Sequence, residues 1–180
     1  MTQQPQQQLL MRRAGLDDLP QLPALPLGYE LRPYAAGADD EMLARLLRLA
    51  FADATWTLAR VRGAFVDDAT VKRTVVVVSR GVAAATASAR LHPDFPGSGY
   101  IHWVATDPFH AGKRLGWIAS LAALREFPAL GCRDAVLETD DARLAAIKTY
   151  LGLGFEPVER GPGHAERWRE IQKRLAGAST

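Results

Sequence analysis

The sequence has 180 residues, of which 48% are hydrophobic, and this is enough to form the core of one domain. Twenty-two basic and 20 acidic residues give a formal net charge of +2, which does not favour a nucleic-acid-binding protein. There is no membrane-length apolar run, no signal-peptide core, and only one cysteine, so an internal disulfide and a thiolate metal cluster are excluded. We therefore expect a soluble cytoplasmic protein with no nucleic-acid or membrane partner.

The first 28 residues are rich in glutamine and proline. This composition predicts a flexible leader over residues 1–28, in which only LLMRRAGL (9–16) is expected to dock locally. A single folded domain is expected over residues 29–180.

Hydrophobic periodicity predicts strands and helices after residue 28. Two β-rich runs are separated only by Arg80-Gly81, which indicates an antiparallel hairpin. The expected elements, in chain order, are a strand over 29–34, helices over 39–51 and 54–66 (the second capped by Thr55), strands over 73–79, 82–91 and 100–105, a helix over 113–127, a strand over 134–139, a helix over 143–151, a strand over 155–160 and a terminal helix over 164–175. An edge strand is the alternative for the last segment. The alternation after residue 113 implies parallel pairing in that half.

A basic, glycine-containing turn lies where a strand gives way to a helix, in TDPFHAGKRLG (106–116). The first turn of a helix offers unpaired N–H groups to an anion, and glycine allows close approach. The P-loop pattern fails because Asp107 and Arg114 stand where it needs Gly and Ser or Thr, and the dinucleotide fingerprint does not fit either. AGKRLG follows the shape of the acyl-CoA pyrophosphate turn, Q/R-x-x-G-x-G/A, with two mismatches. An ordinary helix start with solvated Lys113 and Arg114 is the alternative.

DDARLAAIKTYLGLGFEPV (140–158) resembles the late motif of the GCN5-related N-acetyltransferase (GNAT) superfamily, N-x-x-A-x-x-L-Y-x-K-x-G-F. The matching positions are Ala146, Tyr150, Gly154 and Phe155, whereas Arg143, Thr149 and Gly152 replace the family's Asn, Leu and Lys. Upstream, WVATDPFHAGKRLG is similar to the family's V-x-V-x-P-x-x-R-G-x-G-x-G. The resemblance covers residues 29–158 and is strongest to bacterial members.

The resemblance implies a GNAT-like acyl-CoA N-acyltransferase fold of the mixed α/β class, with a twisted mixed sheet and helices on both faces. Acetyl-CoA would lie in a V-shaped gap between the strands at 100–105 and 134–139, with its pantetheine along the first strand and its pyrophosphate on the basic turn. The implied cosubstrate-binding residues are Val104, Ala105, His110, Ala111, Gly112, Lys113, Arg114, Leu115, Gly116 and Arg143.

Two positions of the turn depart from the family pattern. Ala111 stands where Arg or Gln is usual, and one phosphate-facing side chain is therefore missing. Arg114 stands where Gly is usual, so its side chain must point away, reach the 3′-phosphate of CoA, or block the turn with its Cβ.

The family resemblance gives the role of general acid to Tyr150. A phenol with a pKa of about 10 stays protonated at neutral pH and can donate to the leaving sulfur. For the general base, His102 and Glu138 are the candidates, since both lie on strands that border the gap. A histidine satisfied within the sheet, a tyrosine that only packs, and a water relay in place of a base are the alternatives.

The acceptor is expected against the N-terminal half, where Asp53 and Trp56 would form an acidic and aromatic wall suited to a cationic amine. The four histidines show no metal-ligand spacing, so no metal is expected.

The function expected from these features is direct transfer of an acetyl group from acetyl-CoA to a primary amine, on a small molecule or a peptide, by a monomer or homodimer. The alternative is a non-catalytic acyl-CoA-binding or regulatory module, motivated by Ala111, Arg114 and Arg143.

Overall fold

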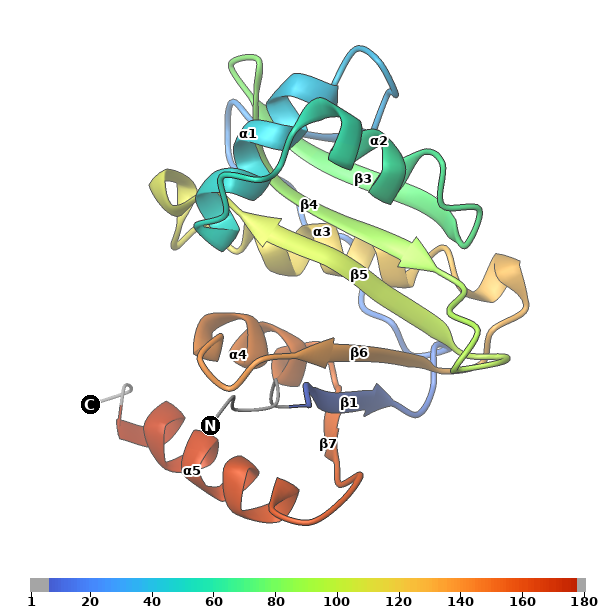
Figure 1. The fold of residues 1–180 in the computed structure, drawn as a ribbon, viewed down its shortest axis with the longest axis vertical. Coiled ribbons are helices and arrows are strands. Elements are labelled where there is room, and N and C mark those ends of the chain that lie inside the picture. The colour runs from blue at the N-terminus through green and yellow to red at the C-terminus, as the bar shows by residue number, and fades with distance from the viewer. Residues whose placement is uncertain (1–6, 178–180) are drawn as a thin grey trace.

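A seven-stranded mixed sheet, in the order β2-β3-β4-β5-β6-β1-β7, runs through the computed structural model, which describes residues 7–177 (Figure 1). The strands are β1 (Leu9–Arg13), β2 (Glu30–Pro33), β3 (Val71–Ser79), β4 (Val82–Arg90), β5 (Gly99–Thr106), β6 (Ala135–Thr139) and β7 (Glu156–Val158). The helices are α1 (Asp40–Phe51), α2 (Leu58–Phe65), α3 (Leu115–Leu124), α4 (Leu144–Gly152) and α5 (His164–Gly177). None of the helices in the described range is long and apolar enough to cross a membrane.

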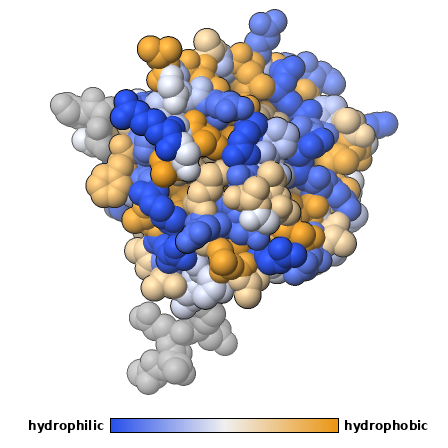
Figure 2. Space-filling model, turned by 90° about the horizontal axis from the view of Figure 1, so that it is seen from above, coloured by the Kyte–Doolittle hydropathy of each residue, from blue (hydrophilic) through white to orange (hydrophobic). Residues whose placement is uncertain are grey.

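The helices cover both faces of the sheet, with α1 and α2 on one face and α3 on the other (Figure 1). The sheet residues under the helices are small on β4, where Ala83 belongs to the core beneath α1 and α2, and Ala85 and Ala87 belong to the core beneath α3. By simple alternation these three residues would share one face, but the register of β4 against β3 shifts between Ala85 and Ala83, and this irregularity turns Ala83 to the other face. On the surface seen in Figure 2, hydrophilic side chains are interspersed with apolar ones, as is usual for a folded domain.

The predicted hairpin is confirmed. Ser79 pairs with Val82 in an antiparallel ladder, and Arg80 and Gly81 both have positive φ, of 50° and 77°. Two central residues with positive φ match the twist of the flanking strands.

The predicted V-shaped gap between the sixth and fifth strands is also present. β5 and β6 are parallel, but they pair only at Gly99 with Ala135 and Tyr100 with Val136. Beyond this point the strands diverge, as the left part of Figure 1 shows. The register of β5 against β4 shifts next to Trp103, whose φ is +46°. Such a bulge bends a strand, and the bend helps to carry the end of β5 away from β6.

Within the expected flexible leader, LLMRRAGL (9–16) was the segment expected to dock locally, and its residues 9–13 are an integral part of the sheet. They form β1, which lies between β6 and β7 and pairs antiparallel with both, and Leu9 and Met11 are fully buried. Residues 1–6 lie outside the described range. In the sequence, LLMRR is a short apolar run beside a Gln-rich segment, with no pattern that marks it as a sheet strand. It is buried because β6 and β7, from the other end of the chain, pair with it. The alternation of elements had predicted parallel pairing for β7. Because β1 lies between β6 and β7, β7 pairs with β1 instead, in the antiparallel sense.

The helix ends differ slightly from the expected ones. Thr57, not Thr55, caps α2, because its side chain accepts a hydrogen bond from the amide of Arg60 at 3.2 Å. α3 begins at residue 115 instead of 113, because Gly112 and Arg114 both have positive φ. The terminal segment is a helix, α5, and not the alternative edge strand.

Candidate active site

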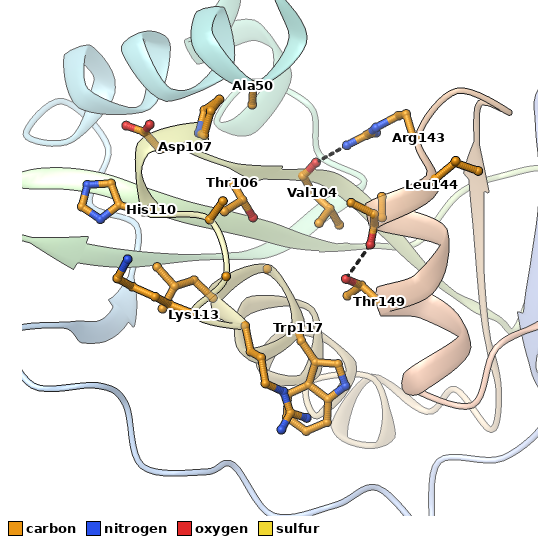
Figure 3. Close-up of a pocket in the computed structure, with 18 of the residues that line it drawn as sticks. Ala50, Val104, Thr106, Asp107, His110, Lys113, Trp117, Arg143, Leu144 and Thr149 are labelled. Carbon is orange, nitrogen blue, oxygen red and sulfur yellow. Dashed lines mark hydrogen bonds between the residues drawn. The ribbon is translucent and has the colours of Figure 1, made fainter. Parts of the chain in front are cut away.

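A cleft of about 440 Å³ opens beside the end of β5, between the basic turn, the first turn of α3 and the first turn of α4 (Figure 3). The predicted cosubstrate residues among its lining are Val104, His110, Ala111, Gly112, Lys113, Arg114, Leu115, Gly116 and Arg143. Further lining residues that the sequence analysis had not assigned to the cosubstrate include Ala50, Thr106, Asp107, Trp117, Ala146 and Thr149. Nine of the ten predicted cosubstrate residues are therefore brought together in one place.

Ala105 is the tenth predicted residue. It is only 1% exposed and belongs to the core beneath α1 and α2. Its side chain points to the opposite face from Val104, because successive strand residues alternate between faces. Only its backbone could therefore take part in binding at the gap.

Asp107 anchors the start of the turn. Its buried carboxylate accepts a hydrogen bond from the amide of Phe109 at 2.9 Å and forms an ion pair with Arg45 of α1 at 3.0 Å. These contacts fix the point where β5 ends and the turn begins. The signal in the sequence was Thr-Asp-Pro, since Asp before Pro is a typical cap of a helical turn.

The backbone of the turn is shaped for a helix start without a side-chain cap. Gly112 and Arg114 adopt φ of 78° and 58°, and no side chain caps the N-terminus of α3. A Cβ on Gly116 would lie 2.6 Å from the Thr106 hydroxyl, so glycine is needed there for close packing on β5. The uncapped first turn, with its positive dipole end, lines the cleft and suits an anion such as a phosphate.

Arg114 stands where the family pattern has Gly. It adopts the left-handed conformation that glycine favours, and its guanidinium carbon lies 4.6 Å from the centroid of the Trp117 ring, which holds the side chain along the wall of the cleft. The indole N–H of Trp117 donates to the Gly152 carbonyl at 3.4 Å and so ties α3 to α4. His110 is held from the other side, where its Nδ1 lies 2.8 Å from the Tyr29 hydroxyl.

Arg143 spans the gap between the two diverging arms. Its Nη2 donates a hydrogen bond to the Val104 carbonyl at 2.9 Å (Figure 3), and its guanidinium carbon lies 5.0 Å from the ring centroid of Phe51. The guanidinium thus touches the edge of β5 where pantetheine was expected.

Tyr150 lies on α4, one residue beyond the cleft-lining Thr149. Its side chain is 2% exposed and packs edge-on against Phe155, with 6.2 Å between ring centroids. Burial raises the pKa of Tyr150 to about 12, so the phenol remains protonated over the whole physiological range. Its hydroxyl makes no hydrogen bond to another residue of the described range, which leaves the proton free for another partner.

His102 does not line the cleft. It lies between Tyr100 and Trp103, and its Nε2 is 3.5 Å from Arg90 Nη1. Burial, then the charge of Arg90, lower the pKa of His102 from 6.5 to about 3, and Asp68 only partly opposes them. The imidazole is therefore neutral and too weak a base to deprotonate an ammonium group at neutral pH.

Glu138 is the second base candidate, and it too lies outside the lining. It accepts a hydrogen bond from the Tyr100 hydroxyl at 3.0 Å and pairs with Arg160 at 2.5 Å. Both carboxylate oxygens of Glu138 are therefore engaged by other side chains, away from the cleft.

The predicted acceptor wall is not formed as expected. Trp56 is 1% exposed and packs against Phe51 and Trp103, and Arg60 lies 4.0 Å from its ring centroid. Asp53 is already bound by Thr55 and Arg60, and these hydrogen bonds lower its pKa to about 2. Trp56 is thus a core residue, because the bulged Trp103 packs onto it, a contact that no local pattern reveals. Between residues 7 and 177 no cluster of three or more His, Cys, Asp or Glu could hold a metal ion.

Comparison with known proteins gives a consistent result. The model of the acetyltransferase (GNAT) family matches residues 40–155. A mycothiol acetyltransferase of Mycobacterium ulcerans is 30% identical in an alignment of 174 positions that covers 84% of this chain and 54% of that protein. The chain spans about half the length of the curated relatives it matches.

Solved structures share the fold. A GCN5-related N-acetyltransferase from Kribbella flavida superposes with a TM-score of 0.58 at 24% identity, over 84% of this chain and 55% of that one. The structure of AAC(6')-Iy in complex with the bisubstrate analogue CoA-S-monomethyl-acetylneamine superposes with a TM-score of 0.60 at 19% identity, over 74% of this chain and 94% of that one. With the family match over most of the sheet and the two motif regions, this chain belongs to the acetyltransferase (GNAT) family.

Proposed function

We propose that the chain transfers an acetyl group from acetyl-CoA to a primary amine by direct transfer in a ternary complex. The observation that carries this proposal is the coincidence, in one cleft, of the uncapped N-terminus of α3, the edge of β5 at Val104 that β6 does not pair with, and the first turn of α4. The N-terminus of α3 suits the phosphates of acetyl-CoA. The edge of β5 suits its extended, amide-containing pantetheine arm, because such an arm can pair with a strand edge.

The residues fit such a ligand. Lys113 and Arg114 place positive charge beside the amides of the turn, and neither has a carboxylate partner in the described part of the chain. The glycine at 112 leaves open space where a Cβ would project, and the backbone can therefore approach a phosphate there. The missing arginine or glutamine at 111 is offset by these two cations.

In the proposed reaction the neutral amine attacks the thioester carbonyl, the tetrahedral intermediate collapses, and the thiolate leaves with a proton from Tyr150. Because its pKa is raised to about 12, the phenol keeps its proton at neutral pH and can donate it as a hydrogen bond to the sulfur as negative charge develops there. His102 and Glu138 were the expected bases, but their contacts favour a water relay in the removal of the proton from the amine. A cytoplasmic location is part of the same proposal and rests on the sequence alone.

Isothermal titration with acetyl-CoA and, separately, with ATP tests the binding step. Micromolar binding of acetyl-CoA without binding of ATP is the expected result, and release of CoA thiol with a panel of primary amines then identifies the acceptor. Absence of acetyl-CoA binding would contradict the proposal.

A second candidate is a non-catalytic acyl-CoA-binding module. The observation that favours it is the Arg143 guanidinium on the Val104 carbonyl, together with the burial of Tyr150. Tyr150→Phe separates the two functions, since an enzyme loses turnover with acetyl-CoA affinity unchanged, whereas a binding module has no turnover in the wild-type protein.

A further inference from the structure

Arg143 occupies the strand edge that an acyl-CoA arm would need. It immediately precedes α4, on one arm of the gap, and it hydrogen-bonds at 2.9 Å to the Val104 carbonyl on the other arm. Val104 lies beyond the last paired residues of β5 and β6, so its carbonyl on the gap side has no strand partner there. An arm that pairs with β5 as an added strand would use the same acceptor from the same side.

The contacts that hold Arg143 are of a releasable kind. Besides the carbonyl, the guanidinium meets the face of Phe51 at 5.0 Å, and no carboxylate of the described residues forms an ion pair with it. The side chain is only half-buried, at the wall of the cleft. A guanidinium held by a carbonyl and an aromatic ring can leave both contacts without stranding a buried charge.

We propose that Arg143 is a latch residue that competes with the pantetheine arm of acetyl-CoA for the Val104 carbonyl. The proposal rests on the proposed function and deepens it, because it says what sets the affinity of the same site. When two groups compete for one acceptor, the apparent dissociation constant of the ligand is the intrinsic constant divided by the fraction of molecules in which the acceptor is free. Arg143 therefore weakens the binding of acetyl-CoA, in contrast to the expectation from sequence that it is a cosubstrate ligand.

The competition concerns only the arm and not the nucleotide end. The phosphates are expected on the turn at Gly112–Gly116, which Arg143 does not contact in the structure. Adenosine 3′,5′-bisphosphate has the nucleotide end but no pantetheine, so it can bind with the latch closed. A latch should change the affinity for acetyl-CoA alone, whereas a general attraction between anions and the positive charge of Arg143 should change the affinities for both ligands.

The test compares Arg143→Ala with Lys148→Ala by isothermal titration. Lys148 is exposed on the same helix and has no ion pair in the described residues, so its removal changes the net charge equally without freeing the carbonyl. Since a hydrogen bond to a charged group can shift an equilibrium by about 10-fold or more, Arg143→Ala is expected to bind acetyl-CoA about 10-fold more tightly. Its affinity for adenosine 3′,5′-bisphosphate should remain unchanged, and Lys148→Ala should leave both affinities close to wild type.

Two results would overturn the latch. Weaker or unchanged acetyl-CoA binding by Arg143→Ala, with bisphosphate binding retained, would make Arg143 a ligand or a bystander. An equal change for both ligands would indicate long-range charge alone. If neither the wild-type protein nor Arg143→Ala binds either ligand, the proposed function fails together with the latch. Arg143→Met, which keeps an apolar stem over Phe51 but has no donor, repeats the test should the alanine variant be unstable.

Discussion

Lowering the pH from 8 to 5 should destabilise this protein through His102. The side chain lies between two aromatic rings and beside Arg90, and burial followed by that charge lowers the pKa of His102 to about 3. The other groups that face it are Asp68, which favours protonation, and His92, which opposes it. Because the folded-state pKa is below the value of about 6.5 in an unfolded chain, the unfolded chain takes up the proton first. The stability contributed is complete above about pH 6.5 and is lost as the pH falls toward 3.

The size of the effect follows from the two pKa values. At pH 5 an unfolded imidazole with a pKa of about 6.5 is almost fully protonated, whereas the folded His102 remains neutral. The free energy of unfolding should therefore fall by about 2 kcal/mol between pH 8 and pH 5 on account of this one group.

Urea unfolding of the wild-type protein and of His102→Gln at pH 8 and at pH 5 measures the contribution of His102 to the free energy of unfolding. The glutamine variant lacks the titrating group, and the other titrations cancel in the comparison, so the wild-type protein should lose about 2 kcal/mol more stability than the variant. At pH 8 the variant should retain acetyl transfer within a few-fold, because so weak a base does not take the amine proton. Equal acid sensitivity of the two proteins would refute the buried neutral histidine. Loss of turnover with an intact fold would restore His102 as the base.

Three further predictions concern the acid, the turn and the first strand. Tyr150→Phe should lower turnover by about 100-fold or more, with little change in stability because the hydroxyl makes no hydrogen bond within the described residues; unchanged turnover in an active enzyme would remove Tyr150 from the mechanism. Arg114→Gly keeps the left-handed backbone and removes the cation over Trp117, so a wild-type preference for CoA over 3′-dephospho-CoA, measured by titration, should disappear. A preference that persists would mean that Arg114 only covers the indole. Met11→Ala should cost about 2–5 kcal/mol in urea unfolding, since this fully buried residue lies in a strand that is paired on both sides, by β6 and β7, whereas a flexible leader would tolerate the change at no cost.

The parts of the site that were predictable from sequence depend on neighbouring residues. The turn at Gly112–Gly116 and the first turn of α4 carry their signals in short stretches, namely glycines, cations and a helical period. The gap between β5 and β6 was predicted through the family resemblance, and the hairpin through Arg80-Gly81. The parts of the site that the sequence analysis missed depend on contacts between distant segments. Asp107 pairs with Arg45 of α1, and neither residue marks the other in the sequence.

By itself, the sequence determined the order and type of most elements, the basic turn before α3 and the family, because periodicity, turn chemistry and motifs act within a few residues. Only the tertiary structure decided that residues 9–13 complete the sheet, that Trp56 belongs to the core, that His102 is held neutral and that Arg143 bridges the gap. Each of these depends on burial or on a partner far away in the chain, and a side chain acquires its pKa, its exposure and its hydrogen bonds only when that partner is in place.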